Sequence, residues 1–124
     1  MDTENLKFAL ERSWCRATCY PGLMDDWSEE NPSLGQCAVT CLVVQDYLGG
    51  DILYCKHLHH YWNEVDGEEI DFTRDQFKDK TVCMDEKRTR DYLLNSKGAR
   101  EARTPERYEF LKERVELFLD EKKD

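Results

Sequence analysis

The stretch that decides the fold reads Asn31-Pro32-Ser33-Leu34-Gly35-Gln36-Cys37 and continues into the apolar run Ala38-Val39-Thr40-Cys41-Leu42-Val43-Val44. The proline cannot lie inside a helix and Ser33 is a plausible N-cap, so the pattern predicts a helix that starts near Ser33–Gln36 and runs to Leu48. Apolar residues recur in this run at steps of three and four, and polar residues are scarce until its end. A helix that is apolar nearly all round is typical of a buried, central position.

Shorter elements flank this helix. Residues 51–56, 59–65 and 68–73 have the pattern of strands, and Asp66-Gly67 between the last two is a strong signal for a two-residue hairpin turn. Further helices are predicted over residues 3–14, with Thr3 as cap, over residues 89–95, and from Thr104 through Phe118. Helices on both sides of a short antiparallel sheet define the α+β class. A length of 124 residues predicts a single domain, 1–124.

Composition narrows the classes of function. The formal net charge is −9 and 36% of the residues are charged, so the overall field does not favour nucleic acid or an anionic membrane as a partner. No apolar run approaches the roughly 20 residues that span a bilayer, and the N-terminus shows no basic region followed by an apolar one. We therefore expect a cytoplasmic protein that binds neither nucleic acid nor membrane.

Six cysteines lie at positions 15, 19, 37, 41, 55 and 83. With no visible secretory signal and enough apolar residues for a core, the sequence favours free thiols over disulfides. The pairs Cys15/Cys19 and Cys37/Cys41 have helical spacing, whereas all-cysteine zinc sites favour tighter knuckles. We expect no metal and no cofactor, and most of these cysteines are expected to be small buried hydrophobes.

Cys37 is the candidate nucleophile. It stands in the first turn of the predicted helix, where unpaired N–H groups and the macrodipole stabilise a thiolate. Gly35 just before it lets the loop pass close to a substrate. Gln36 and Asn31 are candidate oxyanion donors, because an amide can aim its N–H groups at a developing negative charge. Taken alone, the position of Cys37 is equally consistent with an ordinary buried cysteine.

The predicted hairpin adds a base and a carboxylate. Counting outward from the two-residue turn places Trp62 opposite Asp71, with His60 two residues along on the same face. His60 and Asp71 are then diagonal neighbours with Cα atoms roughly 7–8 Å apart, a gap that an imidazole and a carboxylate can bridge. Trp62 can shield that bond from water. Surface histidines are common, but His60 is preferred because the two neighbouring histidines face the other way.

These segments resemble known families. Gly35-Gln36-Cys37, His60-Tyr61-Trp62-Asn63-Glu64-Val65 and Ile70-Asp71-Phe72-Thr73 resemble the Gly-x-Cys, His-x-Trp-x-x-Val and Asp-x-Thr motifs of the transglutaminase-like core, part of the wider papain-like fold. More narrowly, Asn-Pro-x-x-Gly-Gln-Cys-Ala-Val-Thr, Val-Gln-Asp-Tyr-x-Gly-Gly-Asp-Ile and Asp-x-Thr-Arg-x-Gln-Phe are similar to the small bacterial YunG family, whose function is unassigned. The resemblance implies a small papain-like α+β core, in which a central helix packs on a short antiparallel sheet with flanking helices.

The resemblance also implies Cys37 as nucleophile, His60 as base and Asp71 as the group that orients the base. The leading hypothesis is therefore a thiol enzyme that acts, without a cofactor, on an amide or thioester of a small molecule or peptide. Hydrolase, deamidase and acyl transferase all fit this description. The alternatives are a binding or structural module that keeps the fold without turnover, indicated by an inert Cys37, and a Cys/His metal-binding protein.

Overall fold

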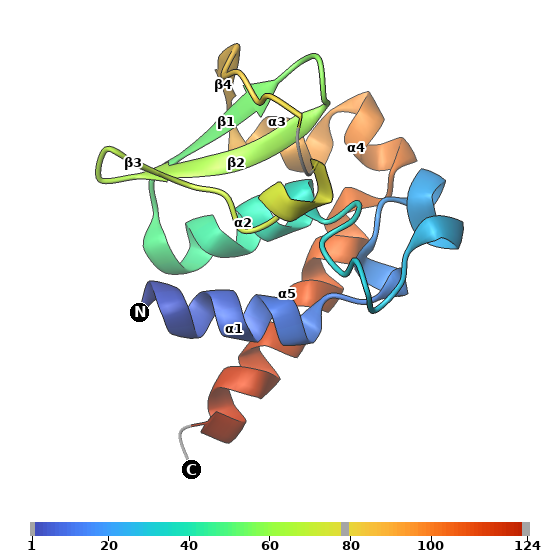
Figure 1. Cartoon of the computed structure of the whole chain (residues 1–124), viewed down its shortest axis with the longest axis vertical. Coiled ribbons are helices and arrows are strands. Elements are labelled where there is room, and N and C mark those ends of the chain that lie inside the picture. The colour runs from blue at the N-terminus through green and yellow to red at the C-terminus, as the bar shows by residue number, and fades with distance from the viewer. Residues whose placement is uncertain (1, 78–79, 123–124) are drawn as a thin grey trace.

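Helix α2 lies between a four-stranded sheet above it and a pair of helices below it (Figure 1). The computed structural model describes residues 2–77 and 80–122. Helix α2 spans Cys37–Leu48, α1 spans Thr3–Ser13 and α5 spans Thr104–Lys122. The central position of α2 follows from its composition, since the whole run from Val39 to Val44 is buried. The structure is therefore of the α+β class.

The sheet is antiparallel throughout and has the order β3-β2-β1-β4. Its strands are β1 (Asp51–Cys55), β2 (His60–Val65), β3 (Glu68–Ile70) and β4 (Glu86–Arg88). One face of the sheet packs on the helical core through Ile52 and Tyr61. On the other face, Leu53, Cys55 and Trp62 form a second, smaller cluster.

The hairpin between β2 and β3 has the predicted register. Val65 pairs with Glu68, and the two turn residues Asp66 and Gly67 both have positive φ, at 52° and 83°, as a primed turn requires. The third strand is shorter than predicted, because the ladder ends at Ile70 rather than at residue 73. Beyond it the Asp71 carboxylate accepts a hydrogen bond from the backbone N–H of Thr73 at 3.3 Å, a local bond that competes with the ladder.

Both predicted helix caps are wrong. Asp2, not Thr3, caps α1, because its carboxylate accepts from the N–H of Glu4 at 3.0 Å. Helix α2 has Gln36 at its N-cap position, and Ser33 instead belongs to the preceding turn, where its carbonyl accepts from the Gln36 N–H at 3.1 Å. The helix therefore starts at the end of the predicted range 33–36, three residues later than a cap at Ser33 would place it.

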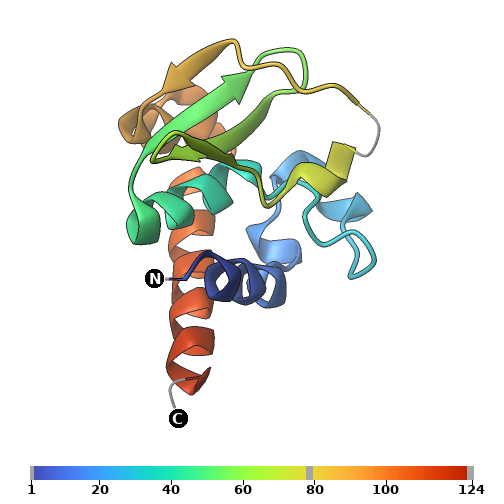
Figure 2. The same cartoon turned by 60° about the vertical axis from the view of Figure 1, so that its left-hand side comes forward.

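Several short elements complete the chain. The 3₁₀ turns are η1 (Arg16–Thr18), η2 (Pro21–Asp26) and η3 (Arg74–Phe77), and the short helices are α3 (Arg90–Asn95) and α4 (Lys97–Glu101). Helix α3 agrees with the helix predicted over residues 89–95, whereas η1, η2, β4 and α4 were not predicted. Figure 2 shows α1 nearly end-on beside α5, with the sheet at the opposite end of the molecule. Within the described ranges, no helix is both long enough and apolar enough to cross a membrane.

Candidate functional site

Cys37 is the first residue of α2 and lines a cavity of about 560 Å³. The helix has no side-chain cap, and its first internal bond runs from the Thr40 N–H to the Gln36 carbonyl at 3.0 Å. The N–H groups of the first turn are therefore free of side-chain acceptors around the thiol. The Cys37 Sγ lies 3.9 Å from the carbonyl oxygen of His59, a residue with positive φ of 49°.

His60 and Asp71 are brought together as the hairpin count predicts. The Nε2 atom of His60 lies 2.7 Å from the Asp71 Oδ2 atom, and the imidazole is 0% exposed. The other carboxylate oxygen of Asp71 accepts from Thr73, through the backbone N–H at 3.3 Å and the hydroxyl at 3.4 Å. Asp71 is thus fixed on one side and orients the His60 ring on the other.

The imidazole of His60 is placed to carry a charge. Burial lowers its pKa, but hydrogen bonds to Asp71 and to the Cys37 thiol, together with their negative charges, raise the pKa to about 9. Asp71 occupies Nε2, and Nδ1 has no hydrogen-bond partner among the described residues, so Nδ1 is the ring atom left available to the thiol. At neutral pH the arrangement favours an imidazolium next to the Cys37 sulfur.

Two aromatic rings enclose this imidazole. Trp62 stacks on it at a centroid distance of 5.4 Å and an interplanar angle of 14°, and Phe77 of η3 meets it edge-on at 4.6 Å. The indole N–H of Trp62 donates to Glu69 at 2.7 Å, which holds the ring in place. The stacking places Trp62 against the imidazole, while the Asp71 side chain stays 16% exposed, so shielding of the bond from water by Trp62 stays a prediction. Phe77 was not expected there.

The two predicted oxyanion donors have different surroundings. Gln36 is buried, its Nε2 atom donates to the Cys15 carbonyl at 3.1 Å, and its Oε1 atom accepts from the Thr18 hydroxyl at 2.7 Å. Its amide thus fixes the residue before Cys37 against η1. Asn31 is not among the residues that line the cavity, and its N–H donates to the Ser28 carbonyl at 3.1 Å. Their oxyanion roles stay predictions.

Gly35 sets the backbone path of the loop that leads into Cys37. Its φ is +71°, and a Cβ atom at this position would lie 2.6 Å from the Cys19 sulfur and 3.0 Å from the Tyr20 nitrogen. The Gly35 carbonyl accepts from the Tyr20 N–H at 2.9 Å, and its own N–H donates to the Gln76 side chain at 3.2 Å. The close approach expected at Gly35 is therefore to another part of the chain.

The remaining cysteines differ from Cys37. Burial, reinforced by the charges of Cys37 and Asp71, raises the pKa of Cys41 well above its ordinary value. Burial also raises the pKa of Cys19 to about 11, although Arg107 and Arg16 oppose the change. Cys83 is exposed, and all six cysteines are free thiols. Within residues 2–77 and 80–122, no group of three or more His, Cys, Asp or Glu side chains is arranged to hold a metal.

The cavity wall contains residues that sequence reasoning missed, above all Tyr54, Tyr61 and Arg107. The sequence did contain a signal for the burial of Arg107 on the core side of its helix. It lies four residues before Leu111 and eight before Val115, so it belongs to the apolar stripe of the last helix, and an arginine in such a stripe requires a reason to be buried. Tyr54 and Tyr61 gave no such signal, because tyrosine is a common residue in β-strands.

Fold and site together define a small α+β protein in which the first residue of a central helix meets a buried histidine–aspartate pair. The chain belongs to the YunG family, since the family model described as "YunG protein" matches residues 2–120. It is 40% identical over 77 residues to a Bacillus subtilis (strain 168) protein described as "Uncharacterized protein YunG". That match covers 60% of this chain and 63% of the relative, so the chain spans less than two thirds of that protein's length. No solved structure matches.

Proposed function

We propose that this protein is a thiol enzyme that acts on an amide or thioester, with Cys37 as nucleophile, His60 as acid and base, and Asp71 as the group that orients His60. The observation that carries the proposal is the state of His60. It is fully buried and held by Asp71 at 2.7 Å, its Nδ1 atom is unpartnered among the described residues, and the Cys37 thiol at the start of α2 is among the groups that raise its pKa. A buried imidazole with a raised pKa beside a cysteine is an arrangement suited to nucleophilic catalysis.

The proposed reaction has two steps. The Cys37 thiolate attacks the carbonyl carbon, and His60 gives its Nδ1 proton to the leaving nitrogen or sulfur as that bond breaks. The acyl group is then bound to Cys37 as a thioester. Neutral His60 takes a proton from the attacking water or acceptor, and Cys37 leaves as a thiolate. The backbone N–H of Cys37 at the uncapped start of α2 supports the developing oxyanion.

The same proposal extends to the architecture. A cysteine at the start of a central helix, a histidine on a neighbouring strand and a carboxylate just beyond the next strand follow the chain order of the transglutaminase-like and papain-like enzymes. Here those positions are Cys37, His60 and Asp71. We regard the fold as a reduced form of that core, built on four strands.

Iodoacetamide labelling with peptide mapping between pH 6 and 10 tests the proposal. Exposed Cys83 is the internal reference for an ordinary thiol, and buried Cys41 is the reference for an inert one. We expect Cys37 to react at least about tenfold faster than Cys83 at pH 7, because the imidazolium and the helix start stabilise its thiolate. Cys41 should be unlabelled in the folded protein.

Variants identify the source of that reactivity. His60→Gln, which keeps the side chain's approximate volume, should slow the labelling of Cys37 to the rate of Cys83, and Asp71→Asn should slow it less. The exposed His57 offers a matched control, and His57→Gln should leave the rate unchanged. The difference in Cys37 labelling rate between wild type and His60→Gln should disappear above pH 9, where the imidazole loses its proton. If Cys37 reacts no faster than in the urea-unfolded chain, the non-catalytic module is the better account.

A further inference from the structure

The cavity beside Cys37 differs in charge from the rest of the molecule. The chain has 27 acidic residues against 18 basic ones. None of the described residues that line the cavity is Asp or Glu, and the permanently charged side chain in its wall is Arg107. In a chain with a net charge of −9, a cavity that lacks carboxylates and contains an arginine is locally suited to an anion.

Arg107 is buried without an acidic partner. The residue is 7% exposed, and among the described residues no carboxylate lies within ion-pair distance of its guanidinium. Its three hydrogen bonds all go to uncharged oxygens, at distances of 2.9, 3.0 and 3.2 Å, on Ala102, Thr18 and Thr104. Burial lowers the pKa of Arg107, and the largest charge that opposes this change is that of the Cys37 thiol, which lines the same cavity. Burying a charge without a close ion-pair partner is costly, so this arginine is suited to a ligand that brings a carboxylate.

The guanidinium has capacity left for that ligand. It carries five N–H donors, of which these three bonds account for three, so two remain. A carboxylate with two oxygens matches such a fork better than a single-point anion does. The same bonds hold the guanidinium in place, because they tie it to η1 and to the segment between α4 and α5. A ligand would therefore meet a pre-oriented donor.

The other walls of the cavity are largely apolar and aromatic. Tyr54 and Tyr61 stand next to each other with ring centroids 4.6 Å apart, and Leu58, Phe77 and Leu93 are among the other apolar residues of the lining, which also includes uncharged polar side chains such as Gln76 and Ser96. A volume of about 560 Å³ lies within the usual range of small-ligand sites. The cavity can thus hold an apolar or aromatic group together with a carboxylate and a carbonyl placed at Cys37.

We propose that Arg107 binds a carboxylate of the substrate, so that the cavity accepts a small amide that carries both a carboxylate and an apolar or aromatic group. An N-acylated amino acid or the C-terminal end of a peptide has this chemistry. The inference about substrate class rests on the proposed function at Cys37, whereas the carboxylate site itself does not. Arg107 would position the substrate, and Cys37 would carry the chemistry.

Binding to full-length protein with Cys37→Ala separates the two proposals, because that variant has no nucleophile. The probes are N-acetyl-phenylalanine and its neutral counterpart N-acetyl-phenylalaninamide, titrated by isothermal calorimetry and by NMR. We expect the carboxylate to bind at least about tenfold more tightly than the amide, with a preference that weakens as salt is raised. Equal binding of the two probes, or binding of neither, would overturn the proposal.

Arginine variants then test whether Arg107 is the residue responsible for the preference for the carboxylate probe. Arg107→Met, made in the Cys37→Ala protein, should reduce the preference for the carboxylate to less than about twofold, whereas Arg100→Met on exposed α4 should leave it intact. Because Arg107 also ties three segments together, circular dichroism must first show that the variant folds. If it does not fold, Arg107→Lys serves instead, and it should weaken the preference by loss of the fork. A preference that survives in the folded Arg107 variants overturns the proposal even if Cys37 proves highly reactive.

Discussion

The single residue that most constrains the site is His60. Full burial disfavours a charged imidazole, yet the bonds to Asp71 and Cys37 outweigh that effect and raise the pKa to about 9. The structure therefore keeps a positive charge in a place where only a nearby negative charge makes it favourable. The groups of the proposed reaction therefore also affect stability, which allows the site to be studied without a substrate.

The raised pKa of His60 predicts a pH dependence of stability. The folded state holds the proton more tightly than the unfolded chain, whose imidazole titrates near 6.5. The stabilising contribution is therefore fully present below pH 6.5 and is lost as the pH rises towards 9. We expect wild type to lose roughly 3 kcal/mol of unfolding free energy across this range relative to His60→Gln. Urea unfolding at pH 6, 7.5 and 9 measures this difference.

Titration of cysteines and tyrosines away from His60 affects both proteins alike, so the difference between them reports on His60 together with the Cys37 thiol coupled to it. Asp71→Asn should reduce the pH-dependent difference, because the amide leaves the imidazolium with less compensation. Parallel curves for wild type and His60→Gln from pH 6 to 9 would mean that the imidazole is uncharged in the folded state, and the ion-pair description of the site would have to be abandoned.

Among the elements, the segment that leads into α2 does most to place Cys37. Gly35 crosses close to the backbone of Tyr20, and Gln36 is bonded to Cys15 and Thr18. The start of α2 is thereby attached to η1 instead of being capped by its own side chains. This attachment leaves the N–H groups around the thiol without side-chain acceptors. It also makes the backbone path before Cys37 sensitive to any side chain added at Gly35.

Gly35→Ala should test that sensitivity. The new Cβ would meet the Cys19 sulfur at 2.6 Å in a backbone region with φ of +71°, so we expect a loss of about 2–3 kcal/mol in unfolding free energy and slower labelling of Cys37. Gly98→Ala is a matched control, because nothing lies within 4 Å of its Cβ position and alanine favours the helix α4. If neither variant changed the unfolding free energy, the loop around Gly35 would have accommodated the new side chain without loss of stability.

Sequence patterns predicted the elements that are long or marked by strong turn residues. The apolar run of α2 and the Asp66-Gly67 hairpin are of this kind, and the hairpin register also predicted the meeting of His60 and Asp71. Strand β4 was missed because its residues Glu86–Arg88 are all charged, and it is specified by backbone pairing with β1 rather than by its own pattern. Helix α4 was missed because it is short and contains a glycine.

The cavity was missed for a related reason. It lies among residues that are far apart in the sequence, from Cys37 through Tyr54 to Arg107, and no local period links them. Only the burial of an arginine within the stripe of α5 gave a local sign of it. Sequence therefore indicated the candidate residues Cys37, His60 and Asp71, which lie on or next to regular elements, better than it indicated the cavity.

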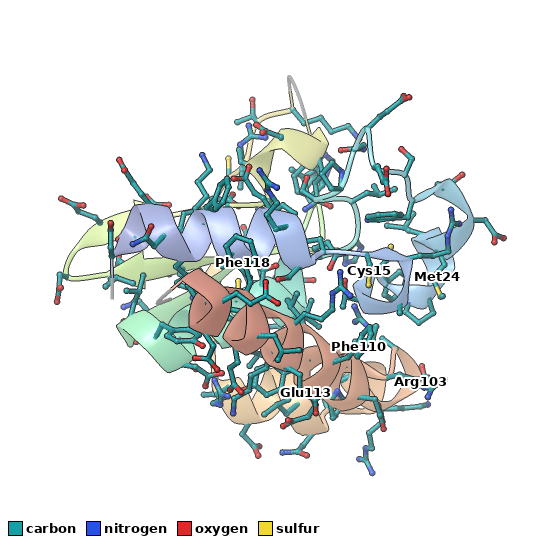
Figure 3. The ribbon with its side chains drawn as sticks, turned by 90° about the horizontal axis from the view of Figure 1, so that it is seen from below. Cys15, Met24, Arg103, Phe110, Glu113 and Phe118 are labelled. Atoms are coloured by element: carbon teal, nitrogen blue, oxygen red, sulfur yellow. The ribbon has the colours of Figure 1, made fainter. Side chains whose placement is uncertain are left out.

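At the scale of the whole molecule, the helices below α2 support the site, and the first turn of α5 also enters the cavity wall through Thr104 and Arg107. Seen from below, α5 crosses α1 with Phe118 near the crossing, where its ring lies 5.4 Å from that of Phe8 (Figure 3). Asn63 joins the sheet to the same core by donating to the Cys41 carbonyl of α2 at 3.1 Å. Through such contacts α2 is held between the sheet and the helices below it.

Leu111 and Leu117 of α5 allow a matched test of how packing far from the cavity supports the site. Leu111 is 0% exposed within the core, whereas Leu117 is 64% exposed on the same helix. Leu111→Ala should cost about 3 kcal/mol through lost burial and a residual cavity, and Leu117→Ala should stay within about 0.5 kcal/mol. Urea unfolding gives both values. Below the unfolding transition, both variants should keep the wild-type labelling rate at Cys37, because neither side chain lines the cavity. A change in that rate in folded Leu111→Ala would show that the core of α5 sets the geometry of the thiol directly, and that site and core do not separate as described.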